Sequence, residues 1–202
     1  MIRYALVAGG VAFDDKHMTP EEWGAAKAAE TYGKGVQLPV MILDDGKVLN
    51  QSMAILKYAA HLGGFTPKSA QEEFECAWFF EQDADLAKKE GVMVPIFNGE
   101  ADQAAQDNTV AHMQAAMEGL NARFADGRKH AAGENITAAD FRLLTIGTSI
   151  IENKSLKIPA LQERLHEMAK GLENIQRVVD NAKAIPGLQA EIEKAMALQS
   201  WI

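Results

Sequence analysis

The chain has 202 residues, of which 48% are apolar and 24% are charged, a composition typical of folded proteins and unlike that of disordered chains. Its net charge of -8 argues against a protein that binds nucleic acid through the phosphate backbone. A single cysteine, Cys76, excludes an intramolecular disulfide and a CxxC motif, and the five histidines lack the spacing of metal ligands. The N-terminus resembles no clear signal peptide, and no window of about 18 apolar residues predicts a membrane span. We therefore expect a cytoplasmic protein with no metal, nucleic-acid or membrane partner.

The first predicted element is a helix. Residues 2–10 (IRYALVAGG) have apolar residues at helical spacing and end on two glycines, which favour a helix C-terminus. Residues 11–15 (VAFDD) then predict a short strand. The chain is therefore expected to begin with a helix followed by a strand.

A β-hairpin and a further helix are predicted next. Residues 39–45 and 47–50 are rich in β-forming residues and are joined by Asp45-Gly46. This pair predicts a tight turn between antiparallel strands, because glycine tolerates the positive φ that such turns require. Residues 52–64 then have the apolar spacing of a helix and end on two glycines.

The rest of the chain has helical periodicity, which indicates a second domain. We expect domains at residues 1–64 and 74–202, joined by a linker at 65–73. Thr137 and Asp140 form a capping box at the start of the most apolar helix, which is expected at the centre of the second domain. Residues 91–100 (GVMVPIFNGE) predict a loop because glycine and proline interrupt the periodicity. The predicted helices span 71–90, 101–125, 135–151, 158–172, 174–185 and 187–198.

Two places around the predicted hairpin could bind a ligand. Pro39 directly precedes a β-rich run, and its peptide bond with Leu38 could be cis. Gln51 and Ser52 stand at the start of a helix, where free N–H groups and the positive end of the helix dipole favour an anion such as a carboxylate. The alternative is purely structural: Pro39 only starts a strand and Ser52 only caps its helix.

A family resemblance joins these features. Trp23, Lys27, QLP at 37–39, NQSMAILKYAA at 50–60 and ITAADF at 136–141 resemble, in order and spacing, the cytosolic glutathione transferases, and the sigma class in particular. The resemblance covers nearly the whole chain. It implies an α/β thioredoxin-like N-terminal domain followed by an all-α C-terminal domain, in a homodimer. It also implies glutathione as co-substrate, conjugated to hydrophobic electrophiles or used in isomerisation or peroxide reduction.

The resemblance further implies how one end of glutathione is held. Trp23 and Lys27 would contact its glycyl end, with Lys27 supplying the charge for the carboxylate. Leu38 would pair its backbone with the cysteinyl residue, beside a cis Pro39 and flanked by Gln37. The loop between Lys27 and Pro39 is longer in this chain than in the family.

The other end of glutathione is assigned in the same way. Gln51 and Ser52 would hold the γ-glutamyl carboxylate at the helix N-terminus. Asp85, with Asp83 as the competing choice, would reach across the dimer to the γ-glutamyl amine. Without that role, the acidic residues at 81–90 would form either a paired-acid site or a solvated helix face.

The catalytic residue cannot be assigned from the sequence. Members of the family open with a strand that carries the catalytic tyrosine, and this sequence begins inside that pattern, so we expect the first strand to be missing. Tyr4 matches a structural position, and Tyr32 is a possible substitute. Two hypotheses follow: an ordinary transferase whose sequence starts late, or an N-terminally truncated, non-catalytic glutathione-binding or structural member.

The acceptor substrate is also open. The resemblance implies a cleft beneath the C-terminal helices that would involve residues 91–99, Met113 or Met117, and Trp201. A methionine-rich lining is adaptable and would favour broad specificity. The alternative is that these residues belong to the ordinary core.

Overall fold

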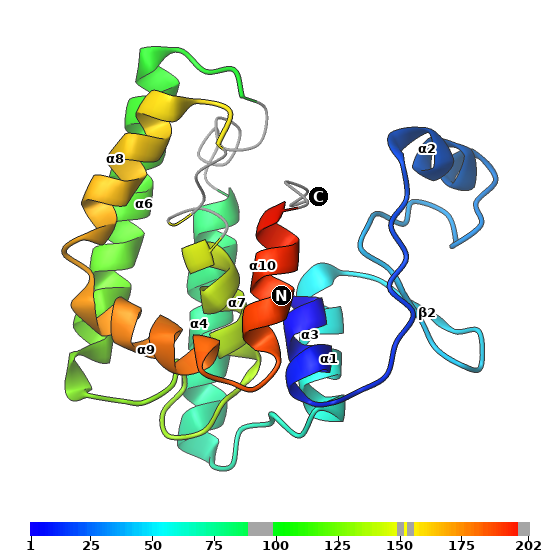
Figure 1. Ribbon diagram of the computed structural model, residues 1–202, viewed down its shortest axis with the longest axis horizontal. Coiled ribbons are helices and arrows are strands. Elements are labelled where there is room, and N and C mark those ends of the chain that lie inside the picture. Colours follow the sequence, from blue (N-terminus) through cyan, green and yellow to red (C-terminus); the bar gives the residue numbers. More distant parts are fainter. Residues whose placement is uncertain (89–98, 149–151, 153–155, 198–202) are drawn as a thin grey trace.

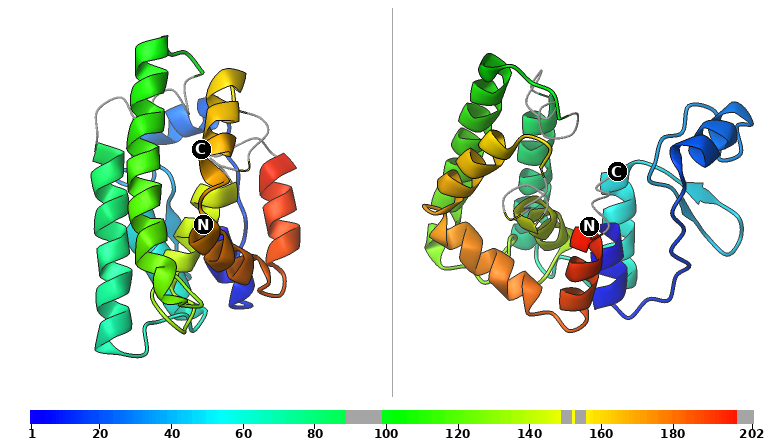
Figure 2. Two further views of the ribbon diagram at one scale, coloured as in Figure 1. Left: turned by 90° about the vertical axis from the view of Figure 1, so that its left-hand side faces the viewer. Right: turned by 45° about the horizontal axis from the view of Figure 1, so that its top comes forward.

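Most helices of the protein pack together, whereas α2 and a β-hairpin near the N-terminus make few contacts with them. The structure, a computed structural model, describes residues 1–88, 99–148, 152 and 156–197. Figures 1 and 2 show α2 and the hairpin standing apart from the other helices. In chain order the elements are α1 (Ile2–Ala8), α2 (Pro20–Ala28), β1 (Met41–Ile42), β2 (Val48–Leu49), α3 (Ser52–Leu62), α4 (Ala70–Lys88), α6 (Gln103–Arg123), the 3-10 turn η1 (Phe124–Asp126), α7 (Ala138–Ile146), α8 (Pro159–Ala169), α9 (Glu173–Lys183) and α10 (Leu188–Ala197).

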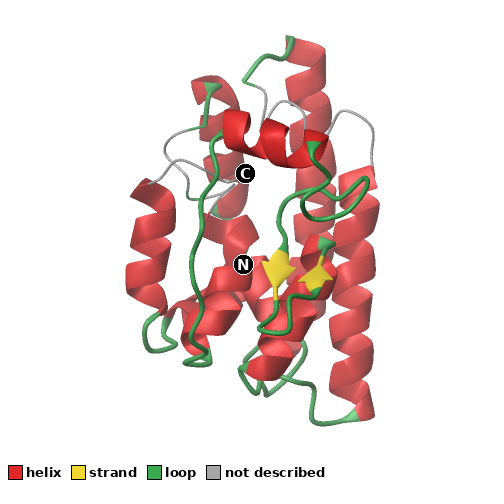
Figure 3. Ribbon diagram, turned by 90° about the vertical axis from the view of Figure 1, so that its right-hand side faces the viewer, coloured by secondary structure: helices red, strands yellow, loops and turns green. Residues whose placement is uncertain are grey.

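The predicted hairpin is confirmed. Strands β1 and β2 pair antiparallel, with Met41 opposite Leu49 (Figure 3). Gly46 has a φ of 83°, and the carboxylate of Asp45 accepts a hydrogen bond from the backbone N–H of Lys47 at 2.9 Å. The turn therefore forms where the Asp-Gly pair predicts it, because glycine supplies the positive φ.

The predicted strand at residues 11–15 is wrong. Residues 11–19 form neither helix nor strand, and within the described residues the sheet consists of β1 and β2. A strand needs a hydrogen-bonding neighbour, and this segment is held by a side chain instead. The Asp15 carboxylate accepts hydrogen bonds from Arg3 Nε at 2.6 Å and Lys194 Nζ at 2.9 Å. Desolvation raises the pKa of Asp15, but the contacts with Lys194 and Arg3 outweigh it and lower that pKa to about 2.

The hydrophobic core is continuous between the two parts of the protein. Tyr4 and Leu6 of α1 and Leu56 of α3 belong to the same buried cluster as apolar side chains of α4 and the helices that follow it. In contrast, no residue between positions 9 and 54 is buried. We call residues 12–50, which include α2 and the hairpin, the arm. Because little apolar surface is buried along the arm, its local geometry depends on turns, caps and individual contacts.

The helical part follows the predicted order. The breaks at Gly171 and Pro186-Gly187 separate α8, α9 and α10 as predicted. Helix α4 already begins at Ala70, inside the segment 65–73 that was expected to be a linker. The predicted loop at 91–100 lies outside the described residues except for its last two positions. None of the described helices is long and apolar enough to cross a membrane.

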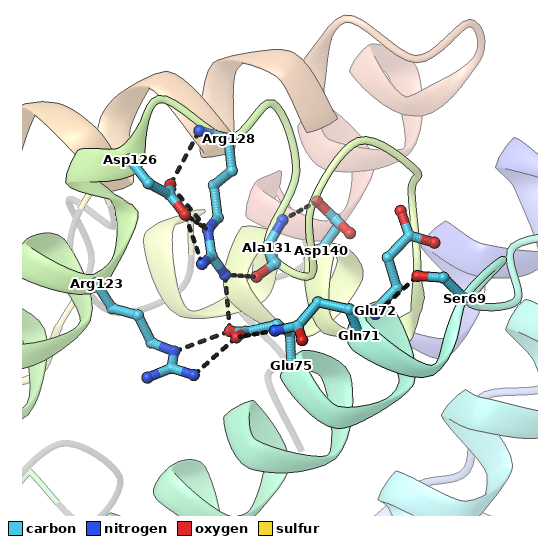
Figure 4. Close-up of polar contacts among 9 residues, drawn as sticks. All are labelled: Ser69, Gln71, Glu72, Glu75, Arg123, Asp126, Arg128, Ala131 and Asp140. Carbon is cyan, nitrogen blue, oxygen red and sulfur yellow. Dashed lines mark hydrogen bonds and ion pairs between the residues drawn. The ribbon is translucent and has the colours of Figure 1, made fainter.

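Buried polar contacts join α4, α6 and α7 (Figure 4). The predicted capping box is confirmed: Asp140, which is fully buried, accepts from the backbone N–H of Thr137 at 2.8 Å. Glu75 is only 6% exposed and accepts hydrogen bonds from the guanidinium groups of Arg123 and Arg128, each at 2.8 Å. Seven of the nine residues of α7 are buried, which confirms its predicted place at the centre of the helical part.

Candidate functional site

The hairpin brings two predicted binding segments to one end of the sheet. Met41 pairs with Leu49, so the turn between the strands lies at one end and the flanking chain leaves from the other. Residues 37–39 come just before β1, and Gln51 and Ser52 come just after β2. Because the strands are antiparallel, both segments lie at the end opposite the turn. A peptide-like ligand at this end can therefore meet a backbone edge and a helix N-terminus together.

The first of these segments offers free backbone groups. The Leu38-Pro39 peptide bond is cis, as the sequence suggested. Leu38 is 39% exposed, and Gln37 and Pro39 are exposed as well. Within the described part of the chain, no hydrogen bond uses the backbone N–H or C=O of Leu38. These two groups can therefore pair with the main chain of an extended peptide.

The second segment is the N-terminus of α3. The predicted alternative, that Ser52 only caps this helix, is wrong: Gln51 occupies the N-cap position, and neither side chain makes a capping hydrogen bond. The first turn of α3 also contains no acidic residue. Gln51 has a φ of 71°, a left-handed conformation that is costly for a side-chain-bearing residue. Uncapped N–H groups at the positive end of a helix suit a carboxylate.

Trp23 and Lys27 lie on α2, a helix that the sequence analysis did not predict. Thr19 and Glu22 form a reciprocal capping box, and Pro20 occupies the first turn. This Thr-Pro-Glu-Glu signal could have revealed the helix. Trp23 is half-buried and Lys27 is exposed. Their spacing of four residues places them on one face of α2. Two side chains on one face can contact the same end of a ligand.

The chain leaves α2 through an unusual C-terminal turn. The backbone N–H of Thr31 donates to the carbonyl of Ala26 at 3.0 Å, and Glu30 has a φ of 51°. The same left-handed turn closes α1 at Gly10 and α3 at Gly64, where glycine adopts it without strain. Glu30 is therefore the one described residue that makes this turn with a side chain.

Replacing Glu30 by glycine is expected to stabilise the end of α2 by about 1 kcal/mol, because it removes the left-handed strain of a residue with a Cβ. Amide hydrogen exchange at Thr31 should slow about fivefold. The matched control is Gly10→Ala at φ 63°, where an added Cβ meets no atom within 4 Å, so that strain alone should destabilise α1. Unchanged or faster exchange at Thr31 in Glu30→Gly would show that the turn is not strained.

The two acidic candidates on α4 have different surroundings. Asp83 forms a two-pronged ion pair with Arg142, with N–O distances of 2.8 and 3.0 Å. This contact occupies the Asp83 carboxylate within its own chain. Asp85 is exposed on α4.

Tyr4, expected at a structural position, and the two methionines suggested for acceptor binding are buried. Tyr4 is 2% exposed, and desolvation raises the pKa of its hydroxyl, so it cannot meet a ligand at the arm. Met113 and Met117 are 1% and 4% exposed, which supports the alternative that they belong to the core. Residues 91–98 and Trp201 lie outside the described residues. No described group of three or more His, Cys, Asp and Glu residues could hold a metal ion.

Comparison with known proteins finds glutathione S-transferases that are similar to this chain in sequence and in fold. "Probable glutathione S-transferase 7" of Caenorhabditis elegans is 27% identical over 196 residues, which cover 91% of each chain. A Nu-class GST from Haemonchus contortus has a solved structure with a TM-score of 0.72 and 25% identity, covering 95% of this chain and 88% of that one. Monomeric Na-GST-3 from Necator americanus gives a TM-score of 0.74 at 22% identity, covering 96% and 89%. No family model matches the chain. The structural likeness confirms the predicted fold class, a thioredoxin-like N-terminal part followed by an all-α part.

Proposed function

We propose that this chain is a glutathione S-transferase that conjugates glutathione to hydrophobic electrophiles, as its similarity to members of that family supports. In this reaction the thiol loses its proton, the sulfur forms a bond to an electrophilic carbon, and the leaving group departs with the bonding electrons. Isomerisation and peroxide reduction with glutathione use the same bound thiol. The sigma class and a cytoplasmic location are part of the proposal.

One observation carries this proposal: the free backbone of Leu38 and the uncapped N-terminus of α3 lie at the same end of the hairpin. Glutathione has a peptide backbone and a γ-glutamyl carboxylate, which match these two features. Leu38 pairs with the cysteinyl backbone, next to cis Pro39 and flanked by Gln37. Gln51 and Ser52 hold the γ-glutamyl carboxylate.

The remaining contacts complete the glutathione site. Trp23 and Lys27 on α2 hold the glycyl end, where the ammonium of Lys27 faces the second carboxylate of the tripeptide. Asp85 meets the γ-glutamyl amine bound by a second copy of the chain. All three side chains are at least partly exposed, as direct ligand contact requires.

A second candidate function is glutathione binding without catalysis. A free thiol with a pKa of about 8.5 is mostly protonated at neutral pH, so conjugation needs a group that stabilises the thiolate. The two tyrosines considered for this role have other neighbours: Tyr4 lies in the core, and the ring of Tyr32 stacks on Trp23. This observation favours a binding or structural family member as the alternative, and it leaves the catalytic residue unassigned.

Measuring both glutathione binding and conjugate formation distinguishes the two proposed functions. The chain should be retained on immobilised glutathione and eluted by free glutathione under either proposal. Formation of the conjugate from glutathione and a chlorinated dinitrobenzene, followed by absorbance, supports catalysis and contradicts the binding-only alternative. Retention without turnover supports that alternative. Loss of both retention and turnover in a folded protein would contradict both proposals.

The proposed carboxylate-binding site at the N-terminus of α3 can be tested with Ser52→Asp. An acidic residue at a helix N-terminus stabilises the helix, by about 0.3–1 kcal/mol, but repels a bound carboxylate. Thermal stability should therefore rise or stay unchanged while the Kd for glutathione increases at least about tenfold. The control is Ser52→Asn, which has a similar shape and no charge. Equal affinity of the two variants would show that no carboxylate binds at this helix.

The homodimer is proposed from one face of α4. Phe74 is 57% exposed, the largest exposed fraction among the bulky apolar side chains that the structure describes. Trp78 and Asp85 follow it at spacings that continue the same helix face. A second copy covering this face would bury the exposed part of the phenylalanine of each protomer, which contributes about 1–2 kcal/mol for each side chain. Burial of Phe74 would thus bring Asp85 to the interface.

Light scattering should give a dimeric mass for the wild-type chain and a monomeric mass for Phe74→Glu, because the new charge would be buried without a partner. The same variant should weaken glutathione binding about as much as Asp85→Ala does, since Asp85 acts on the other protomer's ligand. Phe74→Leu, which keeps an apolar side chain, is the control. A monomeric wild-type chain, as the name of Na-GST-3 states for that protein, would overturn the dimer.

A further inference from the structure

The lengthened loop after α2 places a tyrosine on the proposed glycyl subsite. The rings of Trp23 and Tyr32 are stacked, with centroids 6.1 Å apart and planes inclined by 19°. This separation lies within the range of favourable offset stacking. The Tyr32 hydroxyl donates to the sulfur of Met18 at 4.0 Å. A thioether at this distance is a weak acceptor, so the ring stack is the contact that holds Tyr32 in place.

The stack matters because the core does not hold Trp23. Helix α2 has no buried residue, so its orientation is not set by packing against the helical body. Trp23 and Tyr32 are both half-buried, although most of the arm around them is exposed. Among the described aromatic side chains, Tyr32 is the one whose ring stacks on Trp23. The position of the indole therefore depends on this contact.

The backbone supplies the reason that Tyr32 reaches Trp23. The left-handed turn at Glu30 reverses the chain at the end of α2, with Thr31 bonded back to Ala26. Tyr32 is the next residue, and it returns along the helix toward Trp23. A strained residue at this point is consistent with a turn whose geometry is needed locally.

We infer that Tyr32 is a positioning residue that holds the Trp23 indole against the glycyl end of the ligand. Through this contact the site would distinguish glutathione from γ-glutamylcysteine, which lacks the glycine. The inference rests on the proposed function. It gives Tyr32 a role other than thiol activation. The ring of Tyr32 lies on Trp23 at the glycyl subsite, and its hydroxyl is directed to Met18.

The test compares two ligands that differ only by the glycine. In Tyr32→Leu, isothermal titration calorimetry should show a Kd for glutathione about threefold to tenfold higher, the range expected for loss of an aromatic pair. The Kd for γ-glutamylcysteine should stay unchanged. Tyr32→Phe keeps the ring and should bind both ligands as the wild type does. Trp23→Leu should give the same loss of selectivity, and the double variant should add little to it, because both changes remove one contact.

A measurement without ligand separates the stack from the binding site. In a Trp78→Phe, Trp201→Phe background, fluorescence reports Trp23 alone, and Tyr32→Leu should increase its quenching by acrylamide. If the wild type binds neither ligand, the proposed function fails and the inference fails with it. If the wild type binds glutathione but Tyr32→Leu leaves either its selectivity or the quenching unchanged, only the inference is overturned. An equal rise of both Kd values also overturns it, because general loosening would not depend on the glycine.

Discussion

Replacing Asp140 by alanine is expected to lower the free energy of unfolding by about 4 kcal/mol, the largest effect anticipated for a single substitution in this chain. Asp140 is fully buried, and its two carboxylate oxygens accept from the backbone N–H groups of Ala131 at 2.9 Å and Thr137 at 2.8 Å. Alanine would leave both N–H groups buried without a partner. Each such group costs about 1–3 kcal/mol, in addition to the lost cap of α7.

Denaturant unfolding at pH 7 measures this loss of stability. Two further variants serve for comparison. Asp102 caps α6 by accepting from the N–H of Ala105 at 2.8 Å, but it is exposed, so Asp102→Ala should cost only about 1 kcal/mol. Asp140→Asn keeps the size of the side chain and one acceptor oxygen, and it should fall between the two. If Asp140→Ala cost no more than Asp102→Ala, burial would not be what makes this cap important.

Glu75→Ala is expected to lower the free energy of unfolding by about 3 kcal/mol. Glu75 accepts hydrogen bonds from Arg123 and Arg128, joining α4 to the segments on both sides of η1 (Figure 4). Removing one member of a buried ion pair leaves the other charge desolvated. The expected loss is at the low end for such pairs, because Arg128 keeps an ion pair with Asp126 at 2.7 Å and Arg123 is partly exposed.

The same interaction should depend on pH. Desolvation raises the pKa of Glu75, but the hydrogen bonds from Arg123 and Arg128 outweigh it, so the pKa lies below its ordinary value of 4.5. The stability contributed by Glu75 is therefore complete above pH 4.5 and is lost as the pH falls through the lowered pKa. The stability difference between the wild type and Glu75→Ala should accordingly shrink in acid.

The exposed neighbour Glu73 provides the control for this prediction. Glu73→Ala should change the free energy of unfolding by less than about 1 kcal/mol at any pH between 3 and 7, because Glu73 loses only the favourable position of an exposed carboxylate in the first turn of α4. Urea unfolding at several pH values in this range measures both variants. A stability difference for Glu75→Ala that stayed constant into acid would show that the charge of Glu75 does not carry the interaction.

Several candidate site residues make contacts with residues far away in the sequence, and a local sequence pattern cannot predict such contacts. The choice between Asp83 and Asp85 was open in the sequence, because both lie in one acidic stretch of α4. The structure adds one distant contact to this choice, because Arg142, which is 59 residues away, pairs with Asp83. Met113 and Met117 likewise suit a ligand cleft or a core equally well by residue type. Their burial places them in the core.

Sequence alone determined the features that short-range physics controls. The glycine pairs ended α1 and α3, Asp45-Gly46 formed the hairpin turn, and Thr137 with Asp140 began α7, because each depends on φ preference or on hydrogen bonds between residues a few positions apart. Helix α2 was open to the same reasoning through its capping box at Thr19.

Only the tertiary structure decided the features that need a distant partner. Residues 11–15 have the composition of a strand, but a strand exists only where another strand pairs with it, and Asp15 instead joined Arg3 and Lys194. The stacking of Tyr32 on Trp23 and the shared end of the hairpin for Leu38 and Ser52 arise in the same way. Local preferences fix where elements begin and end, whereas pairing across the fold selects which residues meet, because that energy exists only when the partners are in place.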